Sequence, residues 1–130
     1  CTLGYMSIAL NHTIVHATDP KGSAVLLSEI LGVGSPTPYG PFFVVQVDND
    51  VSLDFMADAH PVRSQHYAFL VGEQEFDEIL TRIKSRDLEY WADPAHRHSG
   101  EINTRDGGRG VYWSDPDGHN LEILTKPYGG

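Results

Sequence analysis

The chain contains an internal repeat of about 54 residues, which limits the folds that it can adopt. His12 and His66 each lie in a strand-like segment, and a helical pattern begins seven residues after each of them, at Asp19 and at Glu73. The two halves keep the same register through these helices without a gap. A repeated unit of one helix and several strands predicts an α+β fold built from two similar modules.

Periodicity assigns the elements of each half. Alternating apolar and polar residues predict strands, and apolar residues at helical spacing predict helices. We expect strands over 7–17, 42–47, 51–57, 65–71, 88–91, 111–114 and 120–125, helices over 19–32 and 73–85, and a loop or irregular edge over 34–40. The last two strands are joined by Asp115-Pro116-Asp117-Gly118, which has the residue order of a tight turn.

These elements define the domain organisation. We expect one domain over 1–130, with module one at about 7–58 and module two at about 64–126. Met6 is expected to be the natural start, with residues 1–5 added during expression. At 130 residues and 40% hydrophobic content, the chain is long enough to bury a core of its own.

The net charge and the cysteine content limit the kinds of partner and the cellular compartment that we expect. The net charge of −9 repels phosphate backbones and anionic membranes, so we expect no nucleic acid and no membrane partner. The one cysteine, Cys1, cannot form an intrachain disulfide, and no apolar run approaches a membrane span. Without a signal-peptide pattern either, we expect a cytoplasmic protein.

Three residues form the candidate metal site. His12 and His66 lie on strands just before the two helices, and Glu122 lies mid-strand, on one face with Asn120 and Leu124. Two imidazoles and one carboxylate form the facial triad that holds a divalent metal and leaves positions open. A single histidine on a strand is more often a core or surface residue, but the symmetric placement of this pair favours ligands.

These residues resemble the vicinal oxygen chelate superfamily, which includes glyoxalase I, extradiol dioxygenases, fosfomycin-resistance thiol transferases and bleomycin-resistance proteins. The resemblance covers Leu10 to about Thr125 and is carried by Leu10-Asn11-His12, Gln65-His66-Tyr67-Ala68-Phe69 and Val111-Tyr112-Trp113-Ser114-Asp115-Pro116-Asp117-Gly118-His119-Asn120-Leu121-Glu122. It implies two βαβββ modules paired into a curved, incomplete barrel, with His12, His66 and Glu122 as metal ligands.

The chain departs from the residue patterns of two activities in this family, those of glyoxalase I and of the extradiol dioxygenases. Glyoxalase I takes a fourth ligand from the last strand of module one, where Asp54 is available but shorter, and Asp54 could equally line the pocket or face solvent. Extradiol dioxygenases carry an acid/base histidine before the position of Val111. This chain has none there, and His98 could substitute only if its loop folds inward.

Two further subfamilies match less well. The fosfomycin enzymes place a threonine where this chain has Ile14, and their arginine after the last strand has no counterpart, so we do not expect that specialisation. The bleomycin-binding members lack the metal triad, and the complete triad here argues against a plain sequestering protein.

Further candidates surround the triad. Tyr112 matches a position where relatives use a tyrosine to hold an anionic oxygen of the substrate. Alternatively, its ring has only a packing role on a pair of strands. His16 shares a strand face with His12 and could line the pocket, whereas His119 in the turn is expected to be structural. Arg105 and Arg109 could clamp an anionic substrate or be solvated.

The sequence therefore predicts a metal-dependent enzyme acting on a small, oxygen-chelating substrate. Three protein ligands with Tyr112 favour a dioxygenase-like reaction on Fe(II). A glyoxalase-type lyase or isomerase using Ni(II), Zn(II) or Mn(II), with Glu122 or Asp54 taking the proton, and a drug-sequestering binding protein remain alternatives. We expect a homodimer, pocket walls from 39–47 and 93–108, and a 93–108 loop that tightens over substrate.

Overall fold

The computed structural model describes residues 8–127, so the expected start at Met6 and the expected addition over 1–5 lie outside the described residues. The chain divides into two compact units, Cys1–Pro61 and Val62–Gly130. The division falls between the two modules expected from the sequence. Among the described residues, each unit carries one α-helix and one four-stranded sheet.

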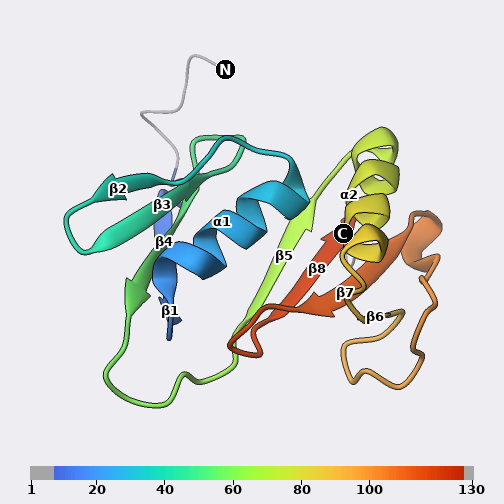
Figure 1. Cartoon of the computed structure of the whole chain (residues 1–130). Coiled ribbons are helices and arrows are strands. Elements are labelled where there is room, and N and C mark those ends of the chain that lie inside the picture. The colour runs from blue at the N-terminus through green and yellow to red at the C-terminus, as the bar shows by residue number, and fades with distance from the viewer. Residues whose placement is uncertain (1–7, 128–130) are drawn as a thin grey trace. The chain divides into compact units, whose positions relative to one another are not determined.

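The first unit contains β1 (His12–Ala17), α1 (Pro20–Leu31), β2 (Thr37–Tyr39), β3 (Phe42–Gln46) and β4 (Ser52–Ala57). Its strands lie in the order β1-β4-β3-β2, with β1 parallel to β4 and the other pairs antiparallel (Figure 1). Asp19 caps α1 by accepting a hydrogen bond from the Gly22 backbone, and Gly32 ends the helix with a left-handed φ of 76°. The buried side of the unit is formed by Val15, Ala17, Ala24, Leu27, Ile30, Val45, Leu53 and Phe55.

Two expectations for this unit need correction. The strand expected over 7–17 begins only at His12, because its partner β4 begins at Ser52 and offers no strand residues to pair with 8–11. Within the irregular edge expected over 34–40, residues Thr37–Tyr39 form a short edge strand. Pro38 is accommodated there because an edge strand leaves one side of its backbone unpaired.

The second unit contains β5 (His66–Leu70), α2 (Glu73–Ser85), β6 (Tyr90–Trp91), β7 (Gly110–Ser114) and β8 (Asn120–Leu124). The strand order β5-β8-β7-β6 repeats that of the first unit, again with one parallel pair, β5 and β8. The expected turn between β7 and β8 is present, since the Gly118 backbone donates to the Asp115 carbonyl over 3.0 Å. The core contains Phe76, Ile79 and Ile83 of α2 with Val111, Trp113, Leu121 and Ile123 of the sheet.

The long connection from β6 to β7 has structure of its own. Trp91 pairs with Ser99 and Asn103 pairs with Gly110 in isolated bridges, and a short 3-10 helix covers Arg105–Gly107. The buried carboxylate of Asp93 accepts hydrogen bonds from the Arg97 and His98 backbones. The connection from β6 to β7 is therefore held by local bridges and hydrogen bonds and is not an unstructured loop.

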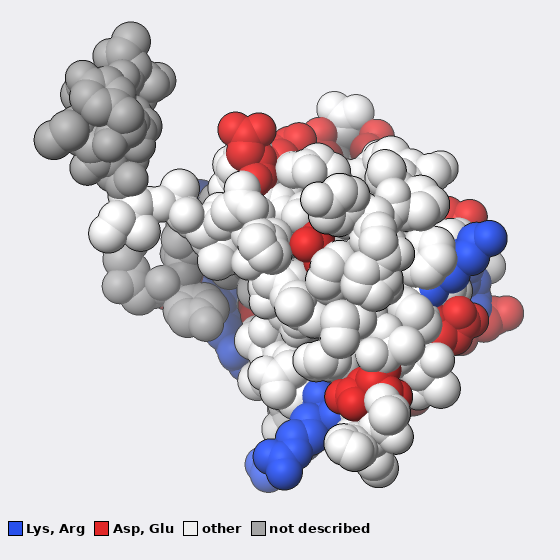
Figure 2. Space-filling view, turned by 90° about the vertical axis from the view of Figure 1, so that its left-hand side faces the viewer, with Lys and Arg blue, Asp and Glu red and all other residues white. Residues whose placement is uncertain are grey.

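The fold class expected from the sequence is confirmed. The structure is α+β, with two open, mixed, four-stranded sheets that repeat one topology, and neither sheet closes into a barrel. None of the described helices is long and apolar enough to cross a membrane. On the face shown in Figure 2, acidic side chains are scattered and Lys and Arg form no cluster.

Candidate functional site

The register of three strands brings His66, Glu122 and Tyr112 together. In the parallel pair of β5 and β8, His66 lies opposite Asn120, and two residues further Ala68 lies opposite Glu122. In the antiparallel pair of β7 and β8, Tyr112 lies opposite Glu122. Because side chains alternate along a strand, these three residues share one face, opposite the buried Leu121 and Ile123.

His66 and Glu122 are in direct contact. The His66 Nε2 and Glu122 Oε1 atoms lie 3.0 Å apart, and the Glu122 side chain is only 5% exposed. His66 Nδ1 lies 2.8 Å from the Asn120 carbonyl oxygen, which can only accept, so Nδ1 carries a proton. Nε2 therefore faces a carboxylate, and the contact is favourable when a proton or a metal cation lies between the two atoms.

The pair fits a divalent cation. A histidine that ligates a metal commonly donates its other N–H to a backbone carbonyl, as His66 does to Asn120. Two ligand atoms about 2.1 Å from a metal and at a right angle lie about 3.0 Å apart, which matches the observed separation. Among residues 8–127, however, no group of three or more His, Cys, Asp or Glu side chains gathers as a metal site.

The third expected ligand, His12, lies in the first unit. Its Nδ1 is 2.7 Å from Asn11 Oδ1, so the ring can donate there and keep Nε2 as a ligand atom, as His66 does. Asp54 lies opposite Ile14, two residues beyond the partner of His12, and this is the position that Glu122 has relative to His66. The repeat therefore makes Asp54 the counterpart of Glu122, and its carboxylate accepts from Ser52 Oγ over 2.8 Å.

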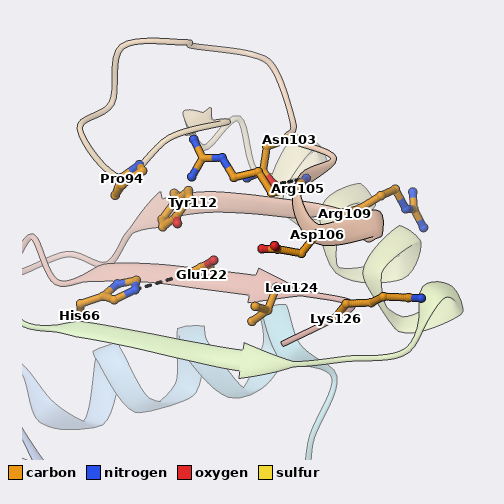
Figure 3. A pocket seen from close by; sticks show the side chains of 10 residues that line it. All are labelled: His66, Pro94, Asn103, Arg105, Asp106, Arg109, Tyr112, Glu122, Leu124 and Lys126. Atoms are coloured by element: carbon orange, nitrogen blue, oxygen red, sulfur yellow. Dashed lines mark hydrogen bonds and ion pairs between the residues drawn. The ribbon is translucent and has the colours of Figure 1, made fainter. Parts of the chain in front are cut away.

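A cavity of about 560 Å³ lies on the His66 and Glu122 side of the second unit. Tyr112 packs its ring against His66, with ring centroids 5.9 Å apart. The expected wall from the loop is confirmed, since Pro94, Asn103, Arg105 and Asp106 line this cavity (Figure 3). The volume is within the range of small-molecule sites.

Other candidate residues are not among those that line this cavity. Residues 39–47 belong to the first unit and do not line this cavity. His16, on the same strand face as His12, has Nδ1 3.5 Å from Asp58 Oδ2. His98 is exposed and is not among the lining residues, although its backbone N–H donates to Asp93.

His119 is structural, as expected. It is 1% exposed, and its Nδ1 accepts a hydrogen bond from the Gln65 backbone over 3.0 Å. Burial raises the pKa of the nearby Asp115, against the lowering effect of the hydrogen bond from the His119 backbone. These contacts hold the turn beside the site.

Sequence reasoning missed the part of Asn120 in the site. Its side chain accepts from His96 Nε2 over 3.0 Å and donates to the Pro94 carbonyl, while its backbone carbonyl holds His66. His96 in turn stacks on Trp91 with ring centroids 3.7 Å apart. Strand alternation placed Asn120 on the face of Glu122, but nothing in the sequence showed that residues 94–96 would return to it.

Two curated proteins are similar to this chain in sequence. No protein-family model matches the chain. It is 25% identical over 126 residues to "Glutathione transferase FosA" of Serratia marcescens, covering 88% of this chain and 79% of that protein. It is 28% identical over 105 residues to "Metallothiol transferase FosB" of Shouchella clausii, covering 78% of this chain and 65% of that protein, just under two thirds of its length.

Solved structures match more fully. "Oxidase ChaP-H1" is 71% identical with a TM-score of 0.93, over 95% of this chain and all of that chain. A glyoxalase/dioxygenase from Nostoc punctiforme shares the fold with a TM-score of 0.68 at 24% identity, over 92% of this chain and 91% of that chain. The chain belongs to the vicinal oxygen chelate superfamily. Membership in the vicinal oxygen chelate superfamily agrees with the two repeated sheets, each of which places a histidine and a carboxylate at matching positions.

Proposed function

We propose that this chain is a metal-dependent enzyme that oxidises a small, oxygen-chelating substrate in a dioxygenase-like reaction. The observation that carries the proposal is the contact of His66 with Glu122 beside Tyr112 in the cavity. His12, His66 and Glu122 are the proposed metal ligands. Fe(II) is the favoured metal, with Ni(II), Zn(II) and Mn(II) as alternatives.

The chain's own residues prepare this chemistry. A divalent metal would act as a Lewis acid toward two substrate oxygens and stabilise the anion that they form. The Asn120 carbonyl keeps the proton of His66 on Nδ1 and directs Nε2 into the site. The phenol of Tyr112, on the same face, is proposed to donate a hydrogen bond to an anionic substrate oxygen.

Similarity to an oxidase supports oxidation over thiol transfer. The chain is 71% identical to "Oxidase ChaP-H1", and far less similar to the two curated transferases. Ile14 also stands where those transferases are expected to carry threonine. The second candidate is a glyoxalase-type lyase or isomerase, which is favoured by Asp54 in the position equivalent to Glu122. We further expect a cytoplasmic homodimer with no nucleic-acid partner.

Metal analysis and oxygen uptake test the proposal together. Protein purified without chelators should contain about one divalent metal per chain, and adding a catechol should consume oxygen. Metal with dicarbonyl isomerisation and no oxygen uptake would favour the lyase. Protein that binds the small molecule without metal would instead indicate a sequestering protein and would overturn the proposed enzyme.

A further inference from the structure

Three cationic side chains line the cavity, and they differ in their partners. The guanidinium of Arg109 lies 2.8 Å from both Glu73 Oε1 and Asp77 Oδ1, and it covers the ring of Phe76 at 4.4 Å. The hydrogen bond from Arg109 lowers the pKa of Asp77, as expected of a formed ion pair. The charge of Arg109 is therefore already balanced by α2.

Arg105 differs from Arg109 in this respect. Within the described part of the chain, no carboxylate pairs with its guanidinium. Its side chain extends over the cavity toward Tyr112, whereas the amine of Lys126 points away from Glu122 (Figure 3). Arg105 is thus the lining cation whose charge faces the space beside the candidate catalytic residues.

The backbone of Arg105 is held in place. Its N–H donates to Asn103 Oδ1 over 3.3 Å, and Asn103 Nδ2 donates to the Ala92 carbonyl over 2.7 Å. The Asn103 backbone also forms two hydrogen bonds with Gly110, of 2.9 and 3.0 Å. A Cβ at Gly110 would lie 2.9 Å from the Asn103 amide, so the absence of a side chain permits this close approach. The backbone of Arg105 is therefore fixed beside the start of β7.

We infer that Arg105 binds a carboxylate group of the substrate, so that the substrate class is a small acid with vicinal oxygens. A planar guanidinium matches the two oxygens of a carboxylate and binds them through parallel hydrogen bonds. The inference rests on the proposed function for the orientation of the substrate, because it places the vicinal oxygens at His66 and Glu122. The carboxylate then lies toward the loop, at Arg105.

A matched pair of ligands tests the inference. The probes are 3,4-dihydroxybenzoate and 4-methylcatechol, which share the vicinal oxygens and differ in a carboxylate against a methyl group. The binding of each ligand to the protein as purified is measured by calorimetry. Arg105→Gln should weaken 3,4-dihydroxybenzoate on the order of tenfold and leave 4-methylcatechol nearly unchanged. Arg105→Lys should recover part of the loss. The control Arg63→Gln, at an exposed position that does not line the cavity, should leave the binding of both ligands unchanged.

The outcomes separate the two proposals. An equal effect of Arg105→Gln on both ligands, or no effect on either, would overturn the assignment of Arg105. Binding of 4-methylcatechol to the wild-type protein would still support the chelating site in that case. Failure of the wild-type protein to bind either catechol would count against the proposed function and would remove the inference with it.

Discussion

His66 and His119 of the second unit differ in the hydrogen bonds that their rings form. His66 donates from Nδ1 to a carbonyl and presents Nε2 to a carboxylate. His119 instead accepts at Nδ1 from a backbone N–H and is buried in the turn. Only the His66 arrangement leaves a nitrogen directed at an acidic side chain in a cavity.

The sharpest prediction at this scale compares Glu122→Gln with His119→Gln. The glutamine at 122 keeps the size of the side chain but lacks the negative charge that offsets a dication, so metal content should fall steeply while the fold survives. The glutamine at 119 should leave metal content nearly intact. Elemental analysis measures the metal, and circular dichroism verifies folding. His12→Ala and His66→Ala should each lose most of the metal.

The opposite result would locate an error. Full metal in Glu122→Gln with loss in His119→Gln would mean that the ligand face of β8 is wrong by one residue, since alternation places positions 119 and 122 on opposite faces.

Single residues were predictable where strand alternation governs them. Alternation placed Glu122 correctly on one face with Leu124, and the position of His119 in the turn predicted its structural contacts. Asn103 and Asp106 lie in the wall predicted over 93–108, but their individual positions could not be predicted, because they depend on isolated bridges and on a left-handed φ of 55° at Asp106. No periodic pattern encodes such contacts.

At the scale of elements, Asn120 connects the loop to β8. Its amide bonds both His96 and Pro94, so it holds the first part of the 93–108 connection beside the site. Asn120→Ala should speed amide hydrogen exchange over residues 94–98, with the α2 amides as an internal control. In the wild-type protein, 3,4-dihydroxybenzoate should slow exchange in this connection. Equal exchange with and without the ligand would contradict closure of the loop over substrate.

The ion pairs of Arg109 fasten the start of β7 to α2, and they predict an acid-sensitive contribution to stability. The pKa of Asp77 is lowered in the folded state by the hydrogen bond from Arg109. The stabilisation is therefore present above the unfolded pKa of about 3.9 and is lost as the pH falls through the lower folded pKa. Urea unfolding between neutral and acid pH should show this loss in the wild type and not in Asp77→Asn. Glu78→Gln, on the same helix, is the matched control and should behave as the wild type.

The elements themselves were largely predictable. Helix α2 begins and ends at the predicted residues, because its apolar positions recur at helical spacing and charges fill the rest. The strand predicted over 7–17 was too long, since alternation continues past the point where a partner strand is available. The strand over Thr37–Tyr39 was not predicted, because it contains Pro38 and strands accept proline mainly at an edge.

At the scale of the whole molecule, the repeat predicted the common topology of the two sheets. Each open sheet leaves two edge strands, which are β1 and β2 in the first unit and β5 and β6 in the second. Large apolar side chains on these strands are exposed, namely Ile14 at 40%, Tyr39 at 73% and Leu70 at 61%. Exposed apolar edges favour pairing with another chain.

We therefore predict a homodimer, since closed twofold assemblies are the commonest way for identical chains to cover such edges. Sedimentation at micromolar concentration should show a species of twice the chain mass, and a single monomeric species would contradict this. Ile14→Lys, Tyr39→Lys and Leu70→Lys each place a charge on a different edge strand. The variant that shifts the protein toward monomer identifies the edge that is used, because a buried unpaired lysine strongly disfavours association while an exposed one does not.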